Sequence, residues 1–170
     1  MSGLVKRPLA IRNPGQGLFR NDHFQIAYAT NDLDRACGVF RERFGIKEYR
    51  RLEGGFPEGG HIRIELAWAG GTMYELIRAE GAGSAFYNVG LSPASFAIRH
   101  HHLGYFVYDQ EGWDALMKEI EQGGWRVAFR TAAEGFLQAC YIEVPELGHY
   151  LEYLFPEAAG IEFFEAVPVS

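Results

Sequence analysis

Two stretches of this chain, QIAYATNDLDRACGVFRER at Gln25–Arg43 and HLGYFVYDQEGWDALMKEI at His102–Ile120, resemble each other at an offset of 77 positions (102 − 25). The Tyr and Asp of YATND then align with those of YFVYD. The same offset, without a gap, aligns GTMYELI with GHYLEYL and so Glu75 with Glu152. An ungapped register held over 50 positions (75 − 25) is hard to obtain by chance. The sequence therefore predicts two copies of one structural unit.

Each copy is predicted to consist of a strand, a helix and then further strands. In the first copy HFQIAYAT is a strand, Asp32 is the N-cap of a helix, and Gly45 ends that helix. The GG between the strands IRIELAWAG and GTMYELIRA is typical of a hairpin turn. In the second copy HLGYFVYD is a strand, Asp109 is the N-cap and Gly123 ends the helix. The strands WRVAFR, FLQACYIEV and GHYLEYLF follow.

The repeat divides the chain into five parts. They are an irregular N-terminal segment (1–20), a first module (21–80), a turn-rich linker (81–99), a second module (100–156) and a C-terminal extension (157–170).

Composition excludes several classes of function. The formal net charge is −6 and there is no cluster of Lys and Arg, so the sequence predicts no nucleic-acid partner. No apolar run approaches the roughly 18 residues of a membrane span, and MSGLVKRPLAIRNPGQG contains no signal-peptide core, so we expect a cytoplasmic protein without membrane contact. Cys37 and Cys140 are far apart in apolar segments and are predicted to be buried free thiols.

Strand alternation selects among the three consecutive histidines of HHHLGYFVYD. Neighbouring side chains of a strand point to opposite faces, so His101 is expected to face away from His100 and His102. His102 shares its face with Gly104, as Gln25 shares one with two alanines, and these small residues leave space. We therefore expect Gln25 and His102 to face a cavity, and His100 and His101 to lie at its rim.

Two glutamates occupy the repeat-related strands. Glu75 and Glu152 have apolar neighbours in both strand phases, and a carboxylate covered on both sides is costly unless it is paired or bound to metal. A lone strand Glu is usually solvated and a lone His usually belongs to the core. The shared register favours the functional interpretation, in which Gln25, Glu75, His102 and Glu152 converge. His23 is in phase with Gln25 and is an alternative ligand.

From Asp22 to Phe155 the chain resembles the vicinal oxygen chelate superfamily, which includes glyoxalase I, methylmalonyl-CoA epimerase, bleomycin-resistance proteins and extradiol dioxygenases. The resemblance implies an α+β fold in which two tandem βαβββ modules form a cup-shaped curved sheet around a metal ion. The family's first-strand pattern, a ligand seven residues before Asp-Leu, matches QIAYATNDL. HHxxxxVxD, ELI and GHYLEYL match the other ligand motifs. This assigns metal ligation to Gln25, Glu75, His102 and Glu152.

The stretch ELIRAEGAGSAFYN…HHLGYFVYD is most similar to the epimerase-like branch. PEGG at Pro57 resembles a loop that carries an acid/base glutamate, which would be Glu58. Many members have His where this chain has Gln25. One glyoxalase I branch uses Gln there with Glu, His and Glu elsewhere, whereas other relatives with Gln have lost the metal.

Such a ligand set suits a divalent Zn, Ni, Co or Mn ion. Two remaining coordination positions would accept a small-molecule substrate through two vicinal oxygens, and the metal would polarise its carbonyl. A carboxylate beside the metal, Glu152 or Glu58, would remove the α-proton. The sequence therefore favours a metal-dependent isomerase, epimerase or lyase, and the family resemblance adds a homodimer.

Two alternatives stay open. An extradiol-type iron dioxygenase needs two His and one carboxylate, which His23, His102 and Glu152 would supply if His23 replaces Gln25. A metal-free binding protein would hold an apolar ligand in the cup. The aromatic residues predicted to line the substrate pocket are Trp68, Phe86, Tyr87, Phe96 and Phe106.

Overall fold

A computed structural model describes residues 17–170, and most of the N-terminal segment predicted to be irregular lies outside them. In chain order the elements are β1 (Asp22–Thr30), α1 (Leu33–Phe44), β2 (Arg50–Gly55), β3 (His61–Ala69), β4 (Thr72–Glu80), a 3-10 helix η1 (Ser84–Phe86), β5 (Ile98–Phe106), α2 (Gln110–Gln122), β6 (Val127–Ala133), β7 (Leu137–Val144), β8 (His149–Pro156) and α3 (Ala158–Glu165). The strands form one eight-stranded sheet in the order β2-β3-β4-β1-β5-β8-β7-β6.

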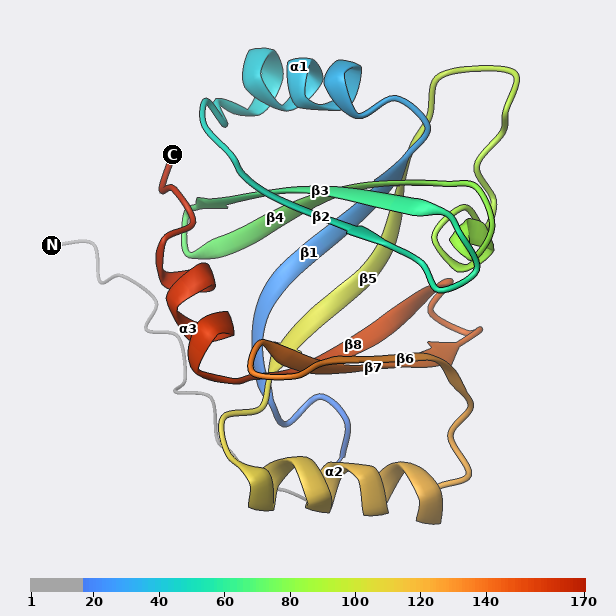
Figure 1. The fold of residues 1–170 in the computed structure, drawn as a ribbon, viewed down its shortest axis with the longest axis vertical. Helices are drawn as coiled ribbons and strands as arrows, with labels where there is room; N and C mark the ends of the chain where they lie inside the picture. Colours follow the sequence, from blue (N-terminus) through green and yellow to red (C-terminus); the bar gives the residue numbers. More distant parts are fainter. Residues whose placement is uncertain (1–16) are drawn as a thin grey trace, which may run out of the picture.

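The strand pairing repeats at the predicted offset. β1 pairs in parallel with β4, placing Ala27 opposite Glu75, and β5 pairs in parallel with β8, placing Gly104 opposite Glu152. The two halves join where β1 and β5 run antiparallel at the centre of the sheet. The sheet curls so that β2–β4 and β6–β8 face each other, with α1 and α2 outside (Figure 1). The predicted α+β fold with two modules and a cup-shaped sheet is confirmed.

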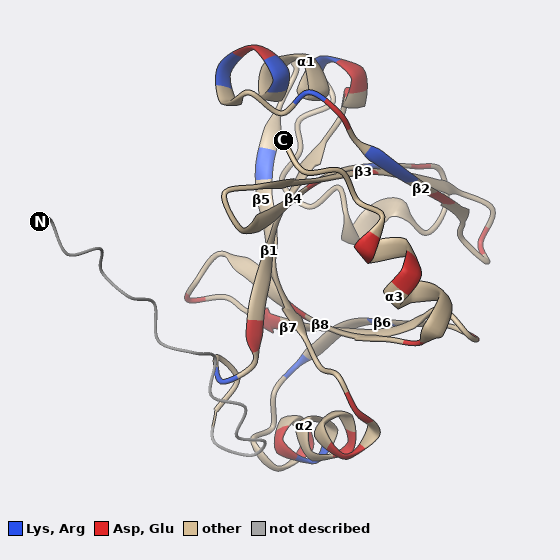
Figure 2. Ribbon diagram, turned by 90° about the vertical axis from the view of Figure 1, so that its left-hand side faces the viewer, with Lys and Arg blue, Asp and Glu red and all other residues tan. Residues whose placement is uncertain are grey.

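Capping places the two outer helices as the sequence predicts. The Asp32 side chain accepts a hydrogen bond from the Arg35 backbone N–H at 3.0 Å, and Asp109 accepts one from Gly112 at 2.7 Å. Gly45 ends α1 with a φ of 77°, a left-handed conformation that favours glycine. Each helix buries one apolar stripe against the convex side of the sheet. Charged residues gather on these helices, and the central strands carry few (Figure 2).

The boundaries differ from the prediction in several places. β5 begins at Ile98 and ends at Phe106, so the three histidines lie inside the strand and not at its start. β2 has the polar sequence RRLEGG and lacks the alternation that predicted the other strands. The linker contains η1, and the C-terminal extension contains α3.

The C-terminal segment ties the two halves of the cup together. The ring of Phe164 in α3 packs edge-on against Phe24 and Phe106. Beyond α3, the Trp68 backbone N–H donates to the Pro168 carbonyl, and the Ser170 N–H donates to the Trp68 carbonyl, both at 2.8 Å. The extension therefore closes one end of the cup and continues to β3. Within residues 17–170, each helix is too short or too polar to cross a bilayer.

Candidate metal centre and its cavity

A β-bulge in β5 decides where the three histidines point. Ala27 pairs with His102 and Tyr28 pairs with His100, so His101 is an extra residue without a partner across the strand pair. Consequently the rings of His101 and His102 lie side by side, with their Nδ1 atoms 2.8 Å apart. His100 packs on Tyr28 instead. The prediction that His101 is a rim residue facing away from His102 is wrong, because the bulge breaks the alternation.

A second bulge, in β1, removes His23 from the site. His23 pairs with Tyr105 and Gln25 pairs with Gly104, which leaves Phe24 as the extra residue. The His23 ring lies 5.2 Å from the Tyr105 ring, on the face that packs against α2. His23 therefore does not reach the cavity, and the alternative in which it replaces Gln25 is wrong. The two-histidine, one-carboxylate set that a dioxygenase needs is not formed among the described residues.

The four predicted ligands converge on one point. His102 Nε2 lies 2.9 Å from Glu152 Oε2, 3.1 Å from Glu75 Oε2 and 3.3 Å from Gln25 Oε1. Their exposed fractions are 0% for His102, 2% for Gln25, 4% for Glu152 and 6% for Glu75. Four polar side chains that are almost fully removed from water thus share one small volume.

Small residues at repeat-related positions make room for this cluster. Gly104 stands where the first module has Ala27. A Cβ atom at Gly104 would lie 2.6 Å from Gln25 Oε1 and 2.8 Å from Gln25 Cβ. The glycine therefore lets the Gln25 side chain cross β5 toward His102.

A hydrogen-bond chain fixes the orientation of His102. His101 Nε2 lies 3.3 Å from the Phe86 carbonyl oxygen and donates to it, so its Nδ1 is the acceptor for the Nδ1–H of His102. Burial, and then the nearby His102, lower the pKa of His101 to about 3, which keeps His101 neutral. This leaves His102 Nε2 directed at the carboxylates.

The two carboxylates reverse the effect of burial on His102. Burial alone lowers the pKa of His102, but the negative charges of Glu152 and Glu75 and their close contacts with the ring outweigh it and raise the pKa to about 10. Burial also raises the pKa of Glu75, and Glu152 adds to this, while His102 opposes it. Without metal, an imidazolium therefore holds the two carboxylates together.

The donor atoms fit a divalent cation. Glu75 Oε2 and Glu152 Oε2 are buried and accept no hydrogen bond of good geometry from residues 17–170, although His102 Nε2 lies close to both. One atom each of Glu75, His102 and Glu152 lies within 4.8 Å of the others, as a shared ion requires. A metal would replace the Nε2 proton of His102, and His101 would keep the Nδ1 proton in place.

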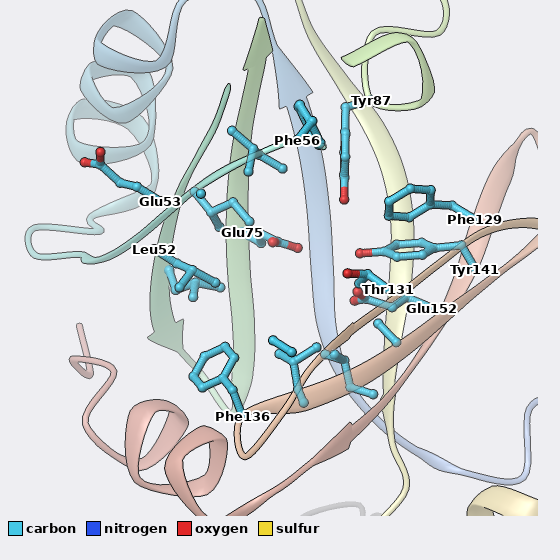
Figure 3. Close-up of a pocket in the computed structure, with 18 of the residues that line it drawn as sticks. Leu52, Glu53, Phe56, Glu75, Tyr87, Phe129, Thr131, Phe136, Tyr141 and Glu152 are labelled. Carbon is cyan, nitrogen blue, oxygen red and sulfur yellow. The ribbon is translucent and has the colours of Figure 1, made fainter. Parts of the chain in front are cut away.

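The cluster lies at the wall of a cavity of about 400 Å³ inside the cup. In Figure 3 the carboxylates of Glu75 and Glu152 and the hydroxyls of Tyr87 and Tyr141 point toward the same space. Burial, and then the charge of Glu152, raise the pKa of Tyr141 well above its ordinary value, so its hydroxyl stays protonated. The hydroxyl of Tyr141 is therefore available as a hydrogen-bond donor beside Glu152.

Of the five aromatic residues predicted to line the pocket, only Tyr87 does so. Phe86 lies behind the wall, stacked on Phe129, and Phe96 lies over Arg35 beside α1. Trp68 and Phe106 line a separate hollow beside α3. The prediction for these four is wrong, because the aromatic character of a residue in a strand or in the linker does not indicate which wall it joins.

Glu58 is not brought to the cluster. It is exposed in the turn between β2 and β3, and it is absent from the cavity wall, which includes its neighbours Phe56 and Pro57. Its carboxylate lies beside Gly83. Sequence reasoning missed His101 and Tyr141, because the first depends on the bulge and the second lies in a strand that is apolar on both faces.

The raised pKa of His102 predicts how pH affects the metal-free protein. Since the folded pKa, about 10, exceeds the ordinary 6.5, the stability that His102 contributes is complete below pH 6.5 and is lost as pH rises through 10. The raised pKa of Glu75 acts in the same direction. Chemical denaturation of metal-free protein from pH 6 to 10 should show a falling free energy of unfolding. His102→Gln should flatten this slope, and an equally steep slope in that variant would contradict the assignment.

No protein-family model matches the chain, and no curated protein matches it either. Solved structures do match. A variant of methylmalonyl-CoA epimerase from Streptomyces coelicolor, in complex with 2-nitronate-propionyl-CoA, has a TM-score of 0.56 and 17% identity over 81% of this chain and 99% of that chain. Methylmalonyl-CoA epimerase from Mycobacterium tuberculosis has a TM-score of 0.58 and 14% identity over 85% and 95%. A hypothetical protein from Bacillus halodurans has a TM-score of 0.57 and 14% identity over 81% and 95%. At these identities the likeness is one of fold.

Proposed function

We propose that this chain, whose fold is that of the vicinal oxygen chelate superfamily and its methylmalonyl-CoA epimerases, is a metal-dependent enzyme that moves a proton next to a carbonyl group. The reaction would be that of an isomerase, an epimerase or a lyase on a small substrate with two vicinal oxygens. The observation that carries the proposal is the convergence of the buried side chains of Gln25, Glu75, His102 and Glu152 at the wall of a largely apolar cavity.

The residues present would divide the work in a simple way. Gln25, Glu75, His102 and Glu152 would hold a Zn, Ni, Co or Mn ion, which as a Lewis acid makes a neighbouring α-proton more acidic. Glu152 would accept that proton from the substrate carbon and return it, to the same carbon or to its neighbour. The protonated hydroxyl of Tyr141 faces Glu152 and would donate to an oxygen on which charge develops.

The surroundings support this use of Glu152. The four side chains of the cluster are almost fully removed from water. This burial strengthens each electrostatic contact among them and would protect a carbanion-like state from stray protons. Glu75 and Glu152 come from opposite halves of the cup at repeat-related positions. A substrate carbon held beside the ion, on its cavity side, would have a carboxylate on each side, which also permits inversion at that carbon.

Metal analysis of the purified protein tests the proposal. We expect Zn, Ni, Co or Mn in the protein as purified or after reconstitution of chelator-treated protein, together with a higher melting temperature. Loaded protein in D₂O should place deuterium at the α-carbon of an α-hydroxy or α-alkyl carbonyl compound. Failure to bind any of these metals, with no change in melting temperature, would contradict the proposal and favour a metal-free binding protein.

His101 is predicted to position the metal ligand His102. His101→Phe keeps a ring against Phe86 and Tyr150 but removes the acceptor of the His102 Nδ1–H. The affinity for Zn, measured by chelator competition, should fall about 10- to 100-fold. Tyr150→Phe alters the same packing and should change it little, and His101→Gln, which keeps an acceptor, should restore part of the loss. Parental affinity in His101→Phe would exclude this role.

A further inference from the structure

The cavity is apolar everywhere except at the metal-site cluster and a few polar groups. Aliphatic and aromatic side chains from both halves face it, among them Leu52, Ile64, Leu66, Phe129, Leu137 and Leu154. Leu52 and Phe129 approach the space from opposite sides, and Phe136 closes one end (Figure 3). A volume of about 400 Å³ lies in the range of sites that enclose most of a small ligand.

The second feature of the wall is its charge. Among residues 17–170, no Lys, Arg or His lines the cavity. Arg63 alternates with the cavity-facing Ile62 and Ile64, and Arg130 lines a different hollow, beside α2. Glu53 belongs to the wall, but its carboxylate points away from the space (Figure 3) and lies 3.5 Å from Arg51 and 3.6 Å from His61.

The helix that closes one end adds no positive charge. α3 contributes Phe164 to the wall, and its charged residues are glutamates (Figure 2). A divalent ion would neutralise the two carboxylates of the cluster and leave no net positive charge for a second anion. An anion placed against the apolar wall would lose its hydration without gaining a partner, which is costly.

We propose that the cup selects a substrate whose body is uncharged and apolar, with the two vicinal oxygens as its only strongly polar end. This rests on the proposed function, because the oxygens need the metal. It separates this chain from the Streptomyces epimerase, whose complex contains a CoA thioester. Among the described residues, the cavity wall offers no cation to an anionic group such as a phosphate. The substrate class is a hydrophobic hydroxycarbonyl, dicarbonyl or similar chelating compound.

Hydroxamic acids of one head group and different tails test this selection. The hydroxamate presents two vicinal oxygens to a metal, so acetohydroxamic acid reports the metal site alone. 4-Isopropylbenzohydroxamic acid adds an apolar body, and 4-carboxybenzohydroxamic acid has nearly the same shape with an anionic end. Calorimetric titration of the Zn-loaded protein should show the isopropyl compound on the order of 100-fold tighter than acetohydroxamic acid. The carboxylate compound should be at least about 10-fold weaker than the isopropyl compound.

A matched pair of variants adds a cation at the cavity and outside it. Thr131 lines the cavity and is exposed, and Ala132 is the next residue of β6, on the other face of the strand. Thr131→Arg should bring the affinity for the carboxylate compound to within a few-fold of that for the isopropyl compound, whereas Ala132→Arg should leave the difference unchanged.

The outcomes separate the two proposals. If the carboxylate compound binds the parent protein as tightly as the isopropyl compound, or if neither binds more tightly than acetohydroxamic acid, the selection for an apolar body is wrong while the metal site stands. If acetohydroxamic acid does not bind the metal-treated protein at all, the proposed function fails and this inference fails with it.

Discussion

Replacing His102 with alanine should lower the free energy of unfolding of the metal-free protein by about 3–5 kcal/mol at neutral pH. His102 is fully buried and lies 2.9 Å from Glu152 Oε2 and 3.1 Å from Glu75 Oε2. The alanine variant leaves two carboxylates close together without a cation between them, and one has to take up a proton. The variant should also lose the rise in melting temperature that metal gives the parent protein.

Denaturant titration with and without metal measures both effects, with His100→Ala as the control. His100 lies two residues away, but it packs on Tyr28 and His149 outside the cavity. We expect its loss to change stability by well under half the cost of His102→Ala, and to leave the metal response intact. The cost of His102→Ala should shrink in acid, where the carboxylates protonate. Equal costs for the two variants would remove the basis for the charged cluster.

Replacing Glu152 with glutamine should reduce α-proton exchange on the order of 10³-fold, because the amide cannot accept a proton. The amide oxygen of the variant remains a possible ligand, so metal binding should weaken much less than exchange does. A large loss of exchange with a small loss of metal affinity distinguishes a residue that acts as the base from one that only holds the metal. Deuterium incorporation into an apolar α-hydroxy ketone, measured at saturating metal, gives the exchange rate.

Glu143→Gln is the matched control for this experiment. Glu143 lies in the neighbouring strand β7, partly exposed and 2.8 Å from Arg126, outside the cavity. His23→Ala, on the face that packs against α2, is a second control. Both should exchange protons as the parent does. If Glu152→Gln binds metal and exchanges the α-proton at the parental rate, Glu152 is not the base.

The repeat explains why so much of the fold was predictable. Periodicity and caps are local properties, and Asp32 and Asp109 cap their helices as predicted. The 77-residue offset also predicts which strands pair and in which register. The pairing of Ala27 with Glu75 in the first module recurs as the pairing of Gly104 with Glu152 in the second. The same register brought the predicted ligands together.

Strand alternation was reliable only where the ladder has no extra residue. The extra residue of a bulge changes which face of the sheet the residues on one side of it point to, relative to those on the other side. The sequence has no signal for the bulges at Phe24 and His101. Two of the errors at the site follow directly: the alternative ligand His23 lies outside the cavity, and His101, expected at the rim, supports His102.

The sequence by itself determined the two-module architecture, the helix caps and the residue types that form the buried polar cluster, because these depend on periodicity and on the cost of placing carboxylates among apolar residues. The tertiary structure alone decided which histidine is held by which partner, that Glu58 lies away from the cluster, and that the cavity wall carries no cation among the described residues. These features depend on strand register, turn conformation and the packing of α3 against both halves, which act between residues far apart in the chain.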